Sequence, residues 1–314
     1  MQGERYGFMT LSIISHPDCA LHDTGAGHPE QAARLSSIQD QLLAAGLDWV
    51  VQHHLAPLAS REQLCRVHTP AYVDKIFQTA PGEGYVMLDA DTRMSPHSLA
   101  AARRAAGASV LAVDLLLSGE THRAFCNVRP PGHHAERDRA MGFCIFNNVA
   151  VGAAHALQAH GLSRVAIVDF DVHHGNGSEA IFRDTPEVLL CSTFQHPFYP
   201  FSESDSSVEH IVKAPLPAGA DGATFRAAVS EQWLPRLRQF QPELILISAG
   251  FDAHINDEMS ELRLTTADYD WVTREIVKIA DESAQGRIVS TLEGGYDLPS
   301  LAQSCAAHIN ALLD

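Results

Sequence analysis

Short runs of residues that are apolar on both faces recur along this chain of 314 residues and constrain its fold more than any other feature. They occupy residues 11–14, 124–128, 165–170, 188–192, 244–248 and 287–292. Strands of a parallel sheet covered by helices need such runs. Longer amphipathic segments lie between the runs, at residues 97–117, 147–160, 223–239, 267–284 and 300–313. The alternation predicts an α/β fold, a single domain with an open, mainly parallel sheet and helices on both faces.

Polar clusters follow four of these runs directly. RPPGHHAE comes after residues 124–128, DVHHGNG after 165–170, AGFDAH after 244–248 and EGGY after 287–292. In open parallel sheets, ligands bind outside the carboxyl ends of the strands. We therefore expect the four strand ends to converge on one site.

Alternation along an extended strand places Asp169, Asp171 and His173 on one face, because residues two apart point the same way. A carboxylate and an imidazole at this spacing can hold one divalent ion. Asp252, in SAGFDAH, is the natural candidate for a third ligand. Three ligands leave a coordination position open for water, which is the arrangement of a catalytic zinc site.

Composition narrows the class of protein. The net charge of −16 would repel nucleic acid and attract cationic partners. The six cysteines form no CxxC pair, which favours reduced cysteines over disulfides or a thiolate metal site. We find no membrane-spanning run and no signal peptide, so we predict a cytoplasmic location without a membrane partner. The first eight residues, MQGERYGF, are a candidate extension of the single domain predicted over residues 1–314.

Eight motifs together resemble the histone deacetylase family, most closely its class II-like and bacterial amidohydrolase members, which have the arginase–deacetylase fold. In the family's order they are HPEQAARL (28–35), VHTPAYVD (67–74), SGE (118–120), VRPPGHHAE (128–136), GFCIFNN (142–148), VDFDVHHGNG (168–177), SAGFDAH (248–254) and EGGY (293–296). The resemblance implies a zinc-dependent amidohydrolase that removes acetyl or other short acyl groups from lysine side chains. It implies that Asp171, His173 and Asp252 are the zinc ligands.

The catalytic residues follow from the same resemblance. His134 matches the family's general base and general acid, and His133 the electrostatic partner beside it. Asp169 matches the orienting partner of His133, and Asn176 that of His134. Tyr296 matches the tyrosine that donates its hydroxyl to the oxyanion, and the glycines before it suggest a mobile loop.

Substrate-binding residues are also implied by the resemblance: Gly142, Phe143, Asp91, Phe198 and Met259. Phe143 matches one wall of the channel for the acyl-lysine stem. The second wall falls at Phe198 or Tyr199. Asp91, with Asp89 as the alternative, matches a rim residue that grips the substrate backbone.

Two potassium sites complete what the resemblance implies. The inner site matches Asp169, Asp171, His173 and Ser192. The outer site matches the backbone carbonyls of Phe182, Thr185 and Val188.

Two positions depart from the family's pattern. Gln31 stands where relatives commonly have an arginine associated with a channel behind the metal, so acetate release is expected to differ. Met259 stands where polyamine-selective relatives have glutamate, although Glu258 and Glu261 are close by in sequence. Both this position and the short segment between residues 72 and 91 favour acyl-lysine in proteins or peptides over acetylated polyamines.

Three alternatives stay open at this point. In the first, the enzyme deacetylates a small acylated amine such as an acetylpolyamine. In the second, it is a binuclear manganese ureohydrolase resembling arginase. In the third, the chain binds acetyl-lysine without catalysis. The ureohydrolase is disfavoured because the paired histidines and Tyr296 serve no obvious purpose in it. The non-catalytic binder is disfavoured because no functional residue of the enzyme is missing. The sequence leaves a homo-oligomer open.

Overall fold

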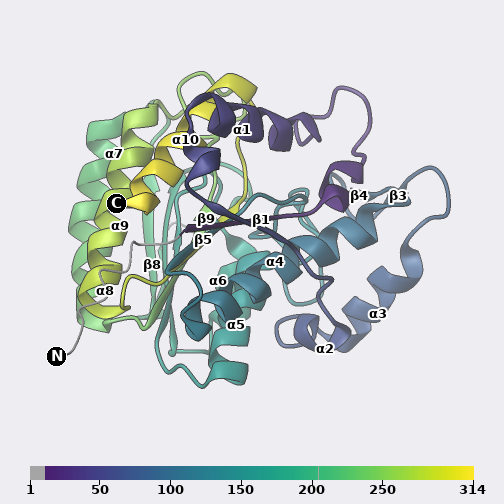
Figure 1. Cartoon of the computed structure of the whole chain (residues 1–314), viewed down its shortest axis with the longest axis horizontal. Helices are drawn as coiled ribbons and strands as arrows, with labels where there is room; N and C mark the ends of the chain where they lie inside the picture. The colour runs from purple at the N-terminus through teal and green to yellow at the C-terminus, as the bar shows by residue number, and fades with distance from the viewer. Residues whose placement is uncertain (1–10, 204) are drawn as a thin grey trace.

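An eight-stranded parallel sheet forms the centre of the protein in the computed structural model, which describes residues 11–203 and 205–314 (Figure 1). Its strand order is β2-β1-β5-β10-β9-β6-β7-β8. The strands are β1 (Leu11–Ser15), β2 (Gln52–Leu55), β5 (Arg123–Cys126), β6 (Val165–Asp169), β7 (Val188–Gln195), β8 (Ile211–Leu216), β9 (Leu244–Ala249) and β10 (Ile288–Leu292). The candidate extension at residues 1–8 lies outside the described residues.

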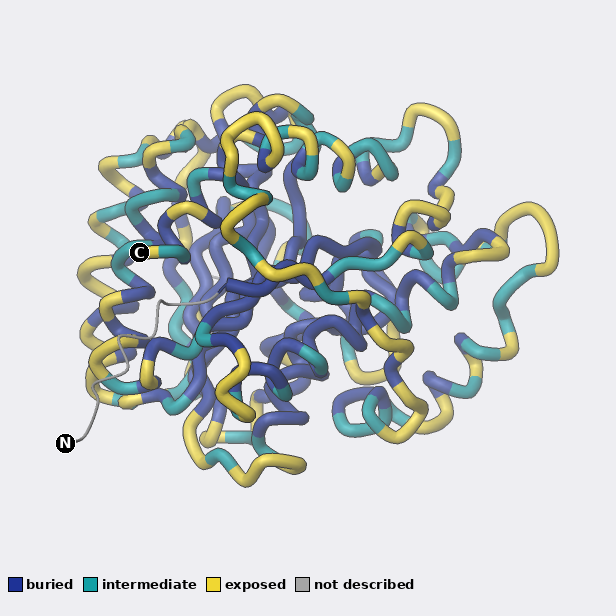
Figure 2. The backbone as a smooth tube through the Cα atoms, viewed as in Figure 1, coloured by how far each residue is buried: buried dark blue, intermediate teal, exposed yellow. Residues whose placement is uncertain are grey.

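Helices cover both faces of the sheet, as predicted. One face packs against α1 (Ala33–Ala44), α7 (Gly222–Ala228), α8 (Leu234–Phe240), α9 (Thr266–Ser283) and α10 (Leu298–Leu313). The other packs against α4 (Ser98–Ser118), α5 (Asn148–His160) and α6 (Asn176–Phe182), with α2 (Arg61–Leu64) and α3 (Pro70–Thr79) beyond them. Consecutive residues of β6 belong to the two cores in turn, Val165 to one and Ala166 to the other. Figure 2 shows the strands as the buried centre, with exposed residues concentrated in the outer loops and helix faces.

The six predicted strands are confirmed, and the sheet has one further strand at each edge. β2, with the sequence QHHL, is largely exposed and lacks an apolar run. β8, with the sequence IVKAPL, mixes buried, partly buried and exposed positions and contains Pro215. A proline is compatible with an edge strand, where its missing N–H breaks no ladder.

The helices predicted from the amphipathic segments also form. Gly119 and Gly161 end α4 and α5 in the left-handed conformation. The segment predicted as one helix over 223–239 is instead interrupted by a π-helical turn at Val229–Trp233. Pro235 lies in the first turn of α8 and lacks the N–H that a continuous helix would require.

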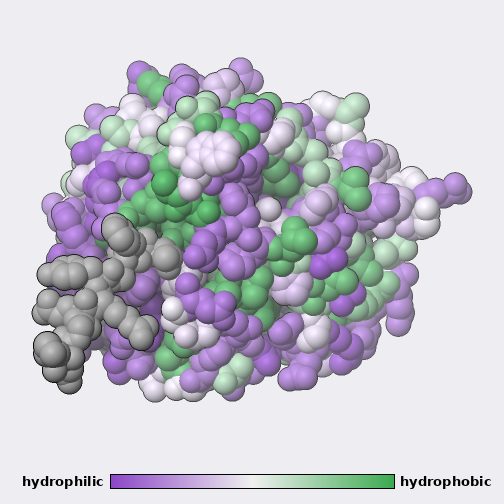
Figure 3. All heavy atoms as spheres, viewed as in Figure 1, coloured by the Kyte–Doolittle hydropathy of each residue, from purple (hydrophilic) through white to green (hydrophobic). Residues whose placement is uncertain are grey.

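A two-stranded antiparallel hairpin, β3 (Val86–Met87) and β4 (Arg93–Met94), stands apart from the main sheet (Figure 1). Its turn carries Asp91 and Thr92. On the face of the molecule shown in Figure 3, polar residues predominate, with smaller apolar groups among them. Within the described residues, none of the helices has the length and hydropathy that crossing a bilayer would demand.

Candidate active site

A pocket of about 340 Å³ opens where the segments that follow β5, β6, β7, β9 and β10 meet. Its floor includes His133, His134 and His173. Its walls are mainly aromatic or apolar, from Phe143, Phe198, Tyr199, Met259 and Tyr296. The convergence expected from the four polar clusters is thus confirmed.

Asp171, His173 and Asp252 meet beside this floor. The Nδ1 atom of His173 lies 3.1 Å from Oδ1 of Asp171 and 3.2 Å from Oδ2 of Asp252. The expectation of a strand continuing through His173 is wrong, because β6 ends at Asp169. The backbone N–H of Asp171 bonds to the Asp169 carboxylate, and that of His173 to the Asp171 carboxylate. These side-chain acceptors replace the sheet ladder, yet the ligand atoms still face one another.

The donor set fits a divalent cation. Oδ2 of Asp252 is buried and lies 3.2 Å from Nδ1 of His173, yet it accepts no hydrogen bond of good geometry, which is rare for a buried charged oxygen. Burial and the charge of Asp171 raise the pKa of Asp252 to about 6. A Cβ at Gly250 would collide with the Asp171 carboxylate, and a Cβ at Gly294 with the carboxylates of Asp252 and Asp171. A cation among these three ligands would neutralise the carboxylates and occupy the cradle.

His133 is oriented as a protonated imidazole. Its Nδ1 donates to Oδ2 of Asp169 at 2.9 Å, and both side chains are buried. Burial alone would lower the pKa of His133, but the carboxylates of Asp169, Asp171 and Glu293 together raise it well above the ordinary value. This imidazole therefore places a positive charge beside the metal cradle.

His134 is held differently. Its Nδ1 lies 2.8 Å from Oδ1 of Asn176. An amide oxygen only accepts hydrogen bonds, so Nδ1 of His134 carries the proton and Nε2 is free to accept one. Burial, followed by the positive charges of His133 and His173, lowers the pKa of His134 well below its usual value. A neutral imidazole with a free Nε2 is suited to act as a general base.

Tyr296 enters the pocket from the glycine-rich segment after β10. Its backbone N–H donates to Oδ2 of Asp257 at 2.6 Å, and the Arg34 guanidinium lies 5.0 Å from its ring centroid. Burial raises the pKa of Tyr296 well above the ordinary value, so its hydroxyl remains a hydrogen-bond donor. Its ring also stands edge-on to Phe143, with the ring centroids 6.2 Å apart.

Gly142 permits the wall residue Phe143 to approach the catalytic histidine. Its φ of 58° lies in the left-handed region, and a Cβ at this position would overlap the ring of His134. Phe143 itself has a φ of 66°, which is unusual for a bulky residue and typical of functional sites. Both Phe198 and Tyr199 form the opposing walls: Phe198 stacks on His173, and Tyr199 stands edge-on to His134.

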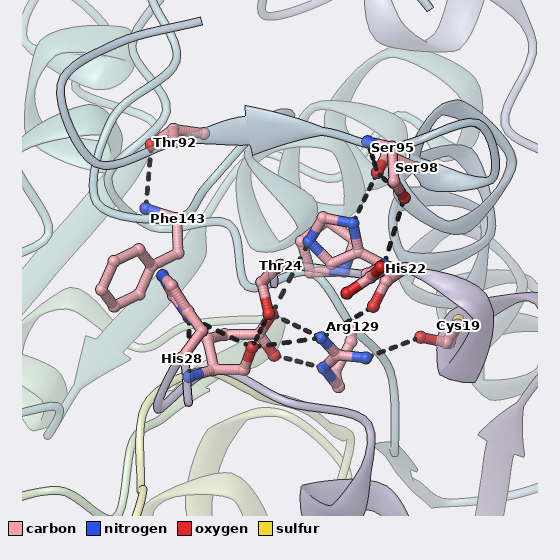
Figure 4. A network of polar contacts seen from close by, with 12 residues as sticks. Cys19, His22, Thr24, His28, Thr92, Ser95, Ser98, Arg129 and Phe143 are labelled. Carbon is pink, nitrogen blue, oxygen red and sulfur yellow. Dashed lines mark hydrogen bonds and ion pairs between the residues drawn. The ribbon is translucent and has the colours of Figure 1, made fainter. Parts of the chain in front are cut away.

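Asp91 is committed to internal hydrogen bonds. Its Oδ1 accepts from the Gly142 N–H at 3.0 Å and the Thr92 hydroxyl at 2.8 Å. Its Oδ2 accepts from the Tyr199 hydroxyl at 3.1 Å. Thr92 also accepts from the Phe143 N–H, as Figure 4 shows. The hairpin turn therefore fastens two walls of the pocket together, whereas the Asp89 carboxylate accepts from the adjacent Ala90 N–H.

Two buried arginines bind the carboxylate of Glu30, next to Gln31, and the effect of Gln31 on acetate release stays a prediction. Gln31 is exposed, whereas Arg34 and Arg129 are fully buried. Arg34 donates to the carbonyl of Gly295 at 2.7 Å and also to that of Glu293. Arg129 binds the buried Glu30 carboxylate and the carbonyls of Cys19 and His22 (Figure 4). Arg34 lies one helical turn after Gln31, in α1.

The residues assigned to potassium lie together in two groups. Asp169 and Ser192 are register partners on β6 and β7, and the Ser192 hydroxyl bonds to Nδ1 of His174. In the outer group, the Phe182 carbonyl accepts from the Thr185 N–H, and the Thr185 carbonyl accepts from the Val188 N–H. Potassium binding stays a prediction.

Two acidic residues at or beside the pocket were not among the predicted site residues. Glu258 lines it beside Met259 and has no hydrogen-bond or ion-pair partner among the described residues. Glu293 is buried, with one carboxylate oxygen accepting the N–H groups of Gly132 and His133. The available signal for Glu258 was its proximity to Met259 in sequence. The available signal for Glu293 was its position in EGGY.

A second group of potential metal ligands, which does not line this pocket, lies on α4 and α5. Asp114 accepts from Nε2 of His155 and of His160, each at 2.7 Å. Arg66 donates to Nδ1 of His155, so that ring nitrogen is an acceptor and Nε2 carries the proton. This arrangement is a hydrogen-bonded chain between two helices, and it provides a control for metal binding at the pocket.

Comparison with known proteins decides the family. Residues 28–312 match the family model described as the histone deacetylase domain. The chain belongs to the histone deacetylase family. A histone deacetylase-like amidohydrolase of Pseudomonas aeruginosa is 37% identical over 86% of this chain and 73% of its own length. The human polyamine deacetylase HDAC10 is 37% identical over 97% of this chain and 48% of its own length.

The fold comparison agrees with the family. The crystal structure of the HDA15 HD domain matches with a TM-score of 0.91 and 34% identity, over 98% of this chain and 89% of that chain. The chain is therefore a histone deacetylase-type amide hydrolase. The resemblance stated from the motifs is confirmed.

Proposed function

We propose that this histone deacetylase-type hydrolase uses one zinc ion to remove acetyl or other short acyl groups from lysine side chains of proteins or peptides. The observation that carries the proposal is the convergence of Asp171, His173 and Asp252 beside His134 and Tyr296 in one pocket. One site then offers a metal cradle, a neutral base and a hydroxyl donor. This combination suits hydrolysis of an amide.

Zinc held by these three ligands would polarise the amide carbonyl and lower the pKa of bound water. Nε2 of His134 takes a proton from the attacking water, because Nδ1 is already protonated and bonded to Asn176. The same nitrogen then delivers that proton to the leaving amine. The Tyr296 hydroxyl donates to the carbonyl oxygen as negative charge develops on it. The positive charge of His133 also stabilises the negative charge that develops on the carbonyl oxygen.

The aromatic walls support a substrate with an extended methylene stem. Phe143, Phe198 and Tyr199 enclose an apolar passage to the floor, which suits the four methylenes of a lysine side chain. A peptide amide on either side of that lysine would then lie outside the pocket.

A second candidate substrate is an acetylated polyamine, and Glu258 favours it. This carboxylate lines the pocket and has no partner in the part of the chain that the structure describes, so it can face a secondary ammonium on the substrate stem. Two relatives of this chain are named polyamine deacetylases. A lysine stem carries no such charge, so the two substrates differ at this position.

One experiment tests the proposal. Zinc-loaded protein is incubated with acetyl-lysine peptides, longer acyl-lysine peptides and acetylated polyamines, and release of the free amine is measured. Turnover of the peptides supports the first candidate, and preferential turnover of polyamines the second. Absence of turnover for every substrate contradicts both, and about two manganese ions per chain by elemental analysis would favour the ureohydrolase. Potassium binding, the domain bounds of 1–314 and the cytoplasmic location remain predictions.

A further inference from the structure

We propose that Glu136 is a positioning residue that sets the protonation pattern of His134 by fixing the orientation of the Asn176 side-chain amide. The inference rests on the proposed role of His134 as the base. Glu136 does not line the pocket, so it acts through Asn176 and not on the substrate.

The starting point is a weakness of asparagine as an orienting partner. A carboxylate accepts hydrogen bonds through either oxygen, so it always selects the imidazole tautomer with a proton facing it. An asparagine amide has an oxygen at one end and a donor NH₂ at the other, and the two are almost isosteric. Turned by a half rotation, Asn176 would donate to Nδ1 of His134. Nε2 would then carry the proton and could not accept another from water.

Acceptors on the far side of Asn176 prevent that rotation. Its Nδ2 donates to Oε1 of Glu136 at 2.8 Å and approaches Sδ of Met141 at 3.3 Å. A carboxylate and a thioether offer no donor to an amide oxygen. The rotated amide would therefore place its oxygen against the negative charge of Glu136. The orientation with Oδ1 towards His134 is the one that satisfies both ends.

Glu136 is itself well fixed. Its backbone N–H donates to the Arg139 carbonyl at 2.9 Å, and its carbonyl lies 2.8 Å from Nδ1 of the buried His68. The Arg139 guanidinium donates to the same Oε1 atom at 2.9 Å. The side chain is 26% exposed, so its charge is partly shielded from water while it contacts Asn176. The chain Glu136–Asn176–His134 thus runs from the surface to the base.

The test compares Glu136→Gln in two backgrounds of the full-length, zinc-loaded protein. A glutamine can present either end to Asn176, so the preference for one orientation disappears. In the parent, we expect kcat to fall about threefold to tenfold with KM unchanged, as for replacement of one charge-assisted hydrogen bond by a neutral one. In an Asn176→Asp background, the partner of His134 needs no orientation. There we expect Glu136→Gln to leave kcat unchanged or to raise it, because it also removes a like charge.

Matched variants separate positioning from general damage. Glu275→Gln removes a carboxylate from an (i, i+3) ion pair with Lys278 on α9 and should change nothing. Arg139→Gln removes the partner of Glu136 but keeps the carboxylate, so kcat should stay within about twofold of the parent. Nitrogen-15 spectra of His134, identified by loss of its signal in His134→Ala, report the tautomer in both zinc-loaded and zinc-free protein. We expect a protonated Nδ1 in the parent and a mixture in Glu136→Gln.

The outcomes are distinguishable. If the parent hydrolyses no acylated amine, the proposed function fails, while the zinc-free nitrogen spectra still test the inference. If the parent is active and Glu136→Gln lowers kcat equally in both backgrounds, the role of Glu136 is merely structural and the inference is wrong. An unchanged tautomer in Glu136→Gln would overturn it as well.

Discussion

The Tyr199 hydroxyl donates a hydrogen bond to Oδ2 of Asp91 at 3.1 Å and joins the β3–β4 hairpin to the segment after β7. The other oxygen of Asp91 holds the Gly142 N–H. This single carboxylate therefore connects two walls of the pocket. An aspartate at the rim would otherwise be free to bind the substrate backbone.

We predict that Asp91→Ala raises KM about tenfold or more, because hydrogen bonds to a charged group contribute roughly 1.5–3 kcal/mol each. Steady-state kinetics on one acyl-lysine peptide would measure this. Tyr199→Phe should reproduce part of the effect, and the double variant should add little to Asp91→Ala. Asp89→Asn is the control and should leave KM unchanged. If Tyr199→Phe leaves KM unchanged, both alone and in the Asp91→Ala background, Asp91 acts on the substrate directly.

The hydroxyl of Tyr296 is expected to act in the transition state alone. Tyr296→Phe should lower kcat by about a hundred- to a thousand-fold while zinc content and folding are preserved. Tyr85→Phe provides a matched control, because its hydroxyl bonds to Asp23 at the surface. Equal activity of Tyr296→Phe and the parent would show that the oxyanion donor lies elsewhere.

Zinc should stabilise the folded chain through Asp252. At a zinc concentration a hundredfold above Kd, mass action supplies about 2.7 kcal/mol, which corresponds to a Tm increase of roughly 4 °C for a chain of 314 residues. Asp252→Asn should abolish this increase. Asp114→Asn should retain it, and loss of the increase in that variant would place the bound zinc between α4 and α5. Differential scanning calorimetry with and without zinc would measure both.

Without metal, Asp252 should destabilise the protein near neutral pH. Its pKa rises from 3.8 to about 6 on folding because of burial and the charge of Asp171. The folded chain thus binds the proton more tightly, and stability falls as the pH rises from 3.8 to about 6. We expect metal-free Asp252→Asn to have a higher Tm than the metal-free parent at pH 7, and the difference to vanish below the unfolded pKa. A lower Tm for the variant at pH 7 would contradict this explanation.

Glu258 should distinguish charged from uncharged substrate stems. Glu258→Gln is expected to reduce kcat/KM for acetylated polyamines up to about fivefold at low salt, since exposed charge pairs contribute little. Acetyl-lysine peptides with neutral flanking residues should be unaffected. Glu261→Gln is the control, because Glu261 does not line the pocket. An equal effect of both variants would mean that the general acidic surface is responsible.

The sequence predicted the buried strands well because both of their faces meet apolar helices. It missed the edge strands β2 and β8, which have a neighbouring strand on one side only. The residues of β2 are mostly polar, and those of β8 are a mixture of buried and exposed residues. The composition of QHHL contains no strand signal, and β2 forms because β1 offers a parallel edge next to it. Pairing between distant segments cannot be seen in local composition.

The metal cradle could be predicted because its ligands follow strands directly, and position after a strand is visible in sequence. The Asp91 connection could not, since it joins segments more than a hundred residues apart through Tyr199. The same holds for Arg34: the family pattern directed attention to Gln31, whereas the buried position lies three residues later on α1. Helical periodicity over residues 33–44 would have been the missing signal.

The candidate metal ligands and the residues of the pocket wall come from different segments, and this separation has an evolutionary consequence. Asp171, His173 and Asp252 come from short segments that are tied together by hydrogen bonds from backbone N–H groups to aspartate carboxylates. Glu258, Met259 and Phe198 come from longer excursions after β9 and β7. Mutations in these longer loops can therefore change which acylated amine the pocket accepts without changing the residues that carry out hydrolysis.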